Sequence, residues 1–199
     1  MTALILVDLQ NDFMPGGALA VREGDLVVAV ANRLMPDYDH VVASQDWHPP
    51  DHLSFAVNHP GAEPGQKIEL GGLPQVLWPV HCVQRSRGAR LHADLDLSGL
   101  DFVVRKGMDR GIDSYSAFFD NGQRSATGLE PWLKERGIDA VDVMGLATDY
   151  CVKFTALDAR RLGFAVRVIT EGCRGVDLSP GDVEGALAEL RDAGVEVVP

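Results

Sequence analysis

The stretch that decides the fold is Ala140-Val141-Asp142-Val143-Met144-Gly145-Leu146-Ala147-Thr148-Asp149-Tyr150-Cys151. Its apolar first part predicts a buried strand, and residues 152–162 after it predict a helix. Cys151 therefore falls at a strand-to-helix turn, where unpaired backbone N–H groups and the positive end of the helix dipole favour a thiolate. This position makes Cys151 a candidate nucleophile, with a buried structural cysteine as the alternative.

The order helix, glycine, apolar strand recurs along the chain, at Arg136-Gly137-Ile138, Leu162-Gly163-Phe164 and Ala193-Gly194-Val195. Glycine just past a helix takes the left-handed conformation that turns the chain back toward a sheet. Such alternation predicts an α/β fold with three α/β/α layers, in which helices cover both faces of a six-stranded parallel sheet. The expected strands are residues 2–7, 40–44, 101–105, 139–144, 165–170 and 195–198, and the expected helices are 24–34, 127–136, 149–162 and 179–193.

Length and charge limit the class of protein. The 199 residues suit one domain, 1–199. A net charge of −11 argues against nucleic acid or an anionic membrane as partner, and no apolar run approaches a bilayer span. The N-terminus has no features of a signal peptide, and the three cysteines form no CxxC pair, so we expect a cytoplasmic protein without disulfides. The sequence does not determine the oligomeric state, so a homo-oligomer remains one of the alternatives.

Residues 47–100 interrupt the alternation after the second strand. No strand is expected there, and the segment holds five of the six histidines: His48, His52, His59, His81 and His92. A long irregular segment within a compact domain is usually functional or disordered, and ligand-type side chains favour function. We therefore expect a long metal-binding loop at this place.

Polar side chains follow four of the predicted strands. Asp8, Asp46 and Lys106 come at or just after strand ends, and Cys151 follows another strand. Ligands of open parallel sheets bind outside the carboxyl ends of the strands, so these four side chains are expected to meet. Asp8, Lys106 and Cys151 suit thiol chemistry, because a buried carboxylate can take the thiol proton and a lysine can stabilise the thiolate.

A second group suits a metal ion. Its members are Asp46, His48, His52 and His81. One carboxylate with two or three imidazoles fits a single divalent ion, Zn²⁺, Fe²⁺ or Mn²⁺, and leaves room for water. His59 and Cys82 remain competing ligands that spacing does not exclude.

Aromatic residues gather in the same segments. They are Phe13, Trp47, Trp78, Tyr115, Phe118 and Phe119. They either pack the loops down or form a flat slot for an uncharged ring.

These residues together resemble bacterial nicotinamidases of the isochorismatase-like cysteine hydrolase superfamily, over essentially the whole chain. The motifs that carry the resemblance are Val7-Asp8-Leu9-Gln10-Asn11-Asp12-Phe13, Gln45-Asp46-Trp47-His48-Pro49, Leu77-Trp78-Pro79-Val80-His81-Cys82, Lys106-Gly107, Asp113-Ser114-Tyr115-Ser116-Ala117-Phe118 and Gly145-Leu146-Ala147-Thr148-Asp149-Tyr150-Cys151-Val152. Each motif alone is weak, and their shared order is specific.

The resemblance implies hydrolysis of nicotinamide to nicotinate and ammonia, in NAD salvage, through a thioester on Cys151. Asp8, Lys106 and Cys151 match the family's triad, and Asp46, His48 and His81 match its metal ligands. His52 matches a ligand that varies among members.

The family further implies a cis peptide between Leu146 and Ala147 and an oxyanion hole from the N–H groups of Ala147 and Cys151. A metal-oriented pyridine ring would lie between Phe13 and Trp78, with Tyr115 lining the slot. Pyrazinamide, a similar ring, would also be hydrolysed.

Other functions remain open at this point. In one, metal-bound hydroxide is the nucleophile and Cys151 is structural. In others, the protein is a related hydrolase of isochorismate, N-carbamoyl amines or another small amide, or a ring-binding protein without catalysis.

Overall fold

The sheet predicted from the sequence is present in a computed structural model that describes residues 1–199. Its strands are β1 (Thr2–Val7), β2 (Val41–Asp46), β5 (Phe102–Lys106), β6 (Ala140–Leu146), β7 (Ala165–Arg174) and β8 (Glu196–Val198). They are ordered β5-β2-β1-β6-β7-β8, and every neighbouring pair is parallel. The prediction of a six-stranded parallel sheet is therefore confirmed.

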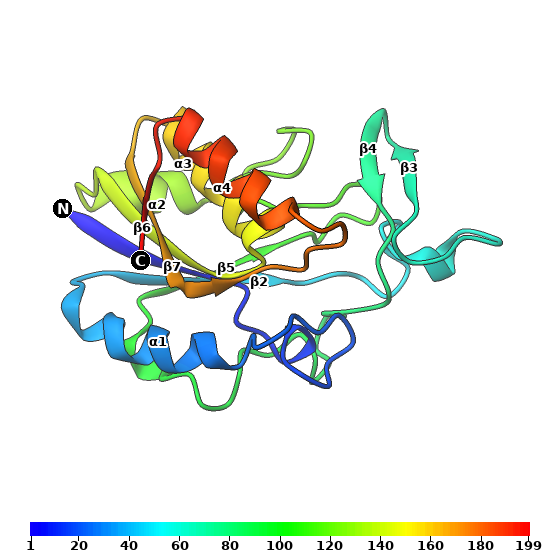
Figure 1. The fold of residues 1–199 in the computed structure, drawn as a ribbon, viewed down its shortest axis with the longest axis horizontal. Helices are drawn as coiled ribbons and strands as arrows, with labels where there is room; N and C mark the ends of the chain where they lie inside the picture. Colours follow the sequence, from blue (N-terminus) through cyan, green and yellow to red (C-terminus); the bar gives the residue numbers. More distant parts are fainter.

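Helices cover both faces of this sheet. They are α1 (Leu26–Leu34), α2 (Leu129–Glu135), α3 (Lys153–Arg161) and α4 (Asp182–Asp192). Figure 1 shows α1 on one face and α3 and α4 on the other. Because β1 lies between two other strands and is covered from both sides, residues 3–7 are entirely buried. No helix is long and apolar enough to cross a membrane.

The segment between β2 and β5 holds a hairpin, so the expectation of no strand there was wrong. Strands β3 (Lys67–Leu70) and β4 (Leu73–Val76) pair antiparallel through the turn residues Gly71 and Gly72. Both glycines have positive φ, which a two-residue hairpin turn requires and glycine adopts freely. Figure 1 places this hairpin at the end of the molecule away from both termini.

Short helical turns fix the remaining loops. They are the 3₁₀ turns η1 (Asn11–Phe13), η2 (Met35–Asp37), η3 (Ala56–Asn58) and η4 (Leu97–Gly99), and the π-helical turn η5 (Thr148–Val152).

The strand order reverses between β1 and β6. The chain passes from β1 to β2 on one side, whereas β6, β7 and β8 follow on the other. Such a switch point opens a crevice at the carboxyl ends of the two central strands. Gly145 permits their close approach, because a Cβ added there would lie 2.7 Å from the Val7 nitrogen. Asp8 directly follows β1 and Cys151 follows β6, so both lie at this crevice.

Candidate active site and metal centre

Lys106, the last residue of β5, brings the predicted catalytic side chains together. Its side chain is fully buried, and Nζ lies 2.8 Å from Asp8 Oδ2. The ammonium also donates hydrogen bonds to Asp46 Oδ1 at 2.6 Å, to the Ser114 carbonyl at 3.0 Å and to Cys151 Sγ at 3.3 Å. A charge this deep in a protein is tolerated only when it is paired, and here two carboxylates pair with it.

The two oxygens of Asp8 have different surroundings. Oδ1 accepts a hydrogen bond from the Ser44 hydroxyl at 2.7 Å. Oδ2 faces the ammonium outside hydrogen-bonding angles and has no hydrogen-bond donor of its own. The Asp8 carboxylate also lies within 4.8 Å of Cys151 Sγ. The Asp8 carboxylate is therefore placed to accept a proton from the thiol.

Burial controls the proton affinities of this group. It raises the pKa of the Cys151 thiol well above its usual value, since the nearby Lys106 ammonium does not offset desolvation and the carboxylates of Asp8 and Asp46. Burial likewise raises the pKa of the Asp8 carboxyl against the opposing ammonium. Burial and the neighbouring carboxylates therefore oppose the thiolate that the turn is expected to favour, and that expectation stays a prediction.

The turn that carries Cys151 differs in shape from the predicted helix start. Residues Thr148–Val152 form a π-helical turn, in which the Val152 N–H donates to the Ala147 carbonyl at 3.1 Å, and α3 begins after it. The predicted cis peptide between Leu146 and Ala147 is confirmed. Ala147 and Cys151 both line the same cavity, which places their backbone near the space for a substrate.

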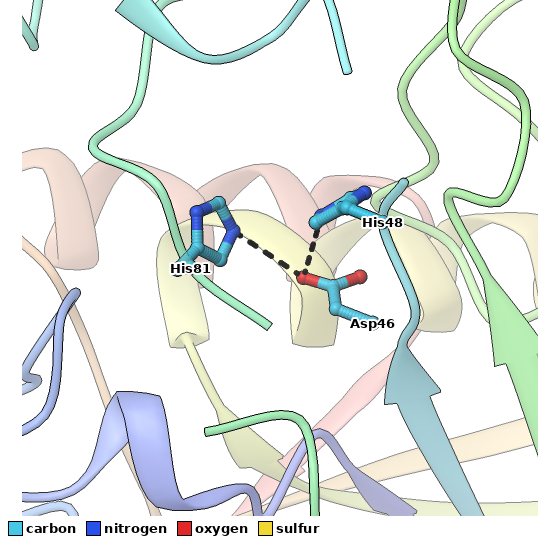
Figure 2. Close-up of side chains that lie close together, drawn as sticks. All are labelled: Asp46, His48 and His81. Carbon is cyan, nitrogen blue, oxygen red and sulfur yellow. Dashed lines mark ion pairs between the residues drawn. The ribbon is translucent and has the colours of Figure 1, made fainter. Parts of the chain in front are cut away.

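Asp46, His48 and His81 form a buried cluster suited to a metal ion. Figure 2 shows both imidazoles directed at one carboxylate oxygen of Asp46. The Nε2 atoms of His48 and His81 lie 3.6 and 3.8 Å from Asp46 Oδ2. Each ring has its Nδ1 2.8 Å from a backbone carbonyl, that of Gly107 for His48 and of Pro79 for His81.

The contacts of the two Nδ1 atoms with backbone carbonyls determine what the cluster can bind. Because a carbonyl only accepts, each Nδ1 carries a hydrogen, and each ring presents an Nε2 lone pair toward Asp46 when it is neutral. Three acceptors then converge without a donor among them, an arrangement that a cation relieves. Although burial acts to raise it, the pKa of Asp46 stays well below its usual value, chiefly because of the Lys106 ammonium, so the carboxylate is ionised and the residues fit a divalent metal.

His52 lies beside this cluster and not in it. Its Nδ1 accepts from the Ser54 N–H at 3.1 Å, and its Nε2 lies 3.3 Å from the Ile112 carbonyl, so Nε2 carries the hydrogen. The structure groups His52 with His48 and Asp113 instead. A role for His52 as a ligand stays a prediction. Of the competing ligands, His59 bonds the Leu53 carbonyl at 2.7 Å, and Cys82 lies outside every group of metal-type side chains.

A narrow cavity of about 30 Å³, lined at one end by Cys151 and at the other by His81 and Asp46, connects the thiol to the metal cluster. Phe13, Trp78 and Tyr115, the predicted slot residues, all line it, together with Cys151 and His81. Tyr115 is fixed by the Trp78 indole, whose Nε1 donates to its hydroxyl at 3.2 Å. Aromatic walls with a few convergent polar groups suit a flat, uncharged ring.

Sequence reasoning missed several residues of this site. They are Ser44 beside Asp8, Asp113 near His48 and His52, and the cavity-lining Leu19, Tyr150 and Val176. Tyr150 was detectable as the neighbour of Cys151, and Asp113 as the first residue of an aromatic motif. Leu19 and Val176 carry no local signal, since only the fold brings them to the cavity.

Comparison with protein families gives a match over residues 2–199 to the family described as Isochorismatase domain. The nicotinamidase of Escherichia coli is 57% identical over 197 residues, which cover 96% of this chain and 92% of that protein. The chain therefore belongs to the isochorismatase family and, within it, to the nicotinamidase group of hydrolases.

Solved structures agree with this placement. A nicotinamidase/pyrazinamidase of Acinetobacter baumanii superposes with a TM-score of 0.96 at 47% identity, covering 99% of this chain and 95% of that one. A pyrazinamidase of Pyrococcus horikoshii in complex with zinc superposes with a TM-score of 0.80 at 36% identity, covering 99% and 98%.

Proposed function

We propose that this protein hydrolyses nicotinamide to nicotinate and ammonia, with residues 1–199 forming one hydrolase domain. The observation that carries the proposal is the buried Lys106 ammonium, which contacts the Cys151 thiol and the carboxylates of Asp8 and Asp46 together. That contact joins a nucleophile, a proton acceptor and a metal-type ligand in one site. The relatives named above, which are nicotinamidases and pyrazinamidases, support this choice of substrate.

The first half-reaction forms a thioester. The Asp8 carboxylate takes the proton of Cys151 Sγ as the sulfur attacks the carboxamide carbon. Burial raises the pKa of the Asp8 carboxyl, which makes it a better acceptor for this proton. Backbone N–H groups of Ala147 and Cys151 would hold the oxyanion. Asp8 then gives its proton to the leaving nitrogen, the C–N bond breaks and ammonia departs.

The second half-reaction releases nicotinate. Asp8 takes a proton from an incoming water, whose oxygen attacks the thioester carbon. The C–S bond breaks, the sulfur recovers the proton from Asp8, and the new carboxylic acid loses its remaining proton to solvent and leaves as nicotinate. Throughout, the Lys106 ammonium limits the negative charge that accumulates among two carboxylates and the sulfur.

Substrate binding uses the other end of the cavity. Asp46, His48 and His81 would hold one divalent ion, Zn²⁺, Fe²⁺ or Mn²⁺, to supply a Lewis acid for the pyridine nitrogen. Phe13 and Trp78 would pack against the ring. Pyrazinamide has the same carboxamide on a similar ring and is proposed as a second substrate. A cytoplasmic location stays a prediction from the sequence.

Ammonia release from nicotinamide tests the proposal. Wild-type protein loaded with Zn²⁺, Fe²⁺ or Mn²⁺ should release ammonia and nicotinate in equal amounts. Cys151→Ala should abolish release, and rapid acid quenching should trap a nicotinoyl adduct on Cys151 of the wild type. Cys173→Ser is the matched control, because Cys173 is also a buried free thiol and only hydrogen-bonds the Ile169 carbonyl. Turnover retained in Cys151→Ala would instead favour a hydrolase without a cysteine nucleophile.

A further inference from the structure

The main chain of Asp46, at the end of β2, extends past the last residue of β1 that pairs with this strand. The β1–β2 ladder pairs Leu4 with Val41 and ends with Leu6 opposite Ala43. Past β1 the chain turns away at Asp8, which has a φ of +54°. The strand that would continue the ladder alongside Asp46 is therefore missing. An unpaired backbone N–H and C=O at a buried position would cost free energy unless another group replaced the strand.

The side chain of Gln10 replaces it. Gln10 is entirely buried, and its Oε1 accepts from the Asp46 N–H at 2.8 Å. Its Nε2 donates to the Asp46 carbonyl at 2.8 Å and to the Ala89 carbonyl at 2.9 Å. The primary amide thus binds both backbone groups of one residue, as a neighbouring strand would. The orientation of the amide is unambiguous, because swapping its N and O would set acceptor against acceptor at two carbonyls.

Asp46 is consequently held from two sides. On the other side it pairs with Lys106 of β5. The Asp46 carboxylate makes a different contact through each oxygen. Oδ1 accepts from the Lys106 ammonium, whereas Oδ2 faces the Nε2 atoms of His48 and His81. A small rotation or shift of the Asp46 backbone would move Oδ2 out of the cluster while Lys106 retained Oδ1.

We infer that Gln10 is a positioning residue for the metal site, which it serves by completing the sheet around Asp46. It touches neither the cavity nor the proposed metal, and it acts through the Asp46 backbone alone. The inference rests on the metal-dependent function proposed above. Residues that orient ligands in this way typically change metal affinity by about 10- to 100-fold when they are removed.

The test compares Gln10→Met with Gln45→Met. Gln45 is also buried, precedes Asp46 in β2 and donates to the same Ala89 carbonyl at 3.0 Å, but its side chain does not bond the Asp46 backbone. Zn²⁺ dissociation constants are measured by competition with a chromophoric chelator, on protein first stripped of metal. Thermal unfolding of the metal-free proteins shows whether each variant folds. The expected result is Zn²⁺ binding about 10- to 100-fold weaker in Gln10→Met and unchanged in Gln45→Met.

Other results would overturn the inference or refute the proposed metal site. Equal losses of Zn²⁺ affinity in both variants, or no loss in Gln10→Met, overturn the inference. If Gln10→Met does not fold, Gln10→Asn replaces it, because that side chain keeps the amide but is one methylene too short. Failure of both to fold also overturns the inference, since Gln10 would then be needed for the fold and not specifically for the site. Wild-type protein that binds no Zn²⁺ refutes the proposed metal site itself.

Discussion

Replacing Lys106 by methionine should destabilise the protein in a way that depends on pH. Methionine keeps most of the apolar stem and removes the ammonium that contacts Asp8 and Asp46. Both carboxyl side chains are almost completely buried, at 0% and 6% exposure. Removing one partner of a buried ion pair costs about 3–5 kcal/mol. For a chain of this size that loss lowers Tm by roughly 6–20 °C.

The sign of the pH dependence follows from the carboxyl groups. Without the ammonium, burial and mutual repulsion raise the pKa of Asp8 and of Asp46 in the folded variant above the unfolded value. A carboxyl whose pKa is raised by folding binds more protons in the folded state, so stability falls as pH rises through that range. The deficit of Lys106→Met against wild type should therefore be large at about pH 8 and smaller at about pH 5.

Thermal unfolding of metal-free protein at these two pH values is the assay, with Lys134→Met as the control. Lys134 also pairs with a carboxylate, Glu130 at 2.5 Å, but its side chain is 55% exposed. Such a surface pair contributes only about 0.3–0.5 kcal/mol, so its Tm should fall by roughly 1–2 °C. A Lys106→Met variant with a Tm as close to wild type as this control, or a deficit that does not shrink in acid, would refute the reasoning.

Three further variants probe separate parts of the molecule. Asp142→Ala removes a buried carboxylate that accepts from Tyr38 and Arg167; because Arg167 is half-exposed, the loss should cost about 1.5–3 kcal/mol in urea unfolding while nicotinamide turnover of the folded fraction persists. Gly107→Ala adds a Cβ 2.6 Å from His48 Nδ1 at a φ of +62°, so Zn²⁺ affinity measured by chelator competition should fall about tenfold or more. Asp8→Asn removes an anion that raises the pKa of Cys151, so iodoacetamide should alkylate the metal-free variant severalfold faster at neutral pH although turnover is lost; unchanged alkylation would contradict the proposed proximity.

The sheet and the convergence of the site were predictable from the sequence for one physical reason. Parallel strands align their carboxyl ends, so any polar residue directly after a buried apolar run falls on one edge. Asp8, Lys106 and Cys151 were assigned to that edge from their positions alone. The roles given to Ala147, Phe13 and their neighbours came from family resemblance, and the contacts now place those residues around one cavity.

Other features depend on the packed structure and could not be predicted from the sequence. The raised pKa of Cys151 results from burial and from two neighbouring carboxylates, neither of which spacing reveals. The tautomer of His52 depends on the Ser54 N–H, a contact across a local bend. Gln10 carries a polar side chain in a polar loop, and nothing local indicates that it replaces a strand beside Asp46. The Gly-Gly turn of the β3–β4 hairpin is visible in the sequence, but its two short strands lack the strongly apolar pattern that would have identified them.

Sharing of one ammonium by Asp46 and Cys151 has a thermodynamic consequence. Because Lys106 contacts both, a change in charge at one of them alters the free energy of the other. Such coupling between equilibria is reciprocal: the factor by which a bound cation changes the ionisation constant of the thiol equals the factor by which ionisation changes the affinity for the cation. Titrating the sulfur with and without Zn²⁺, and measuring Zn²⁺ affinity at two pH values, should therefore give the same energy from two independent directions.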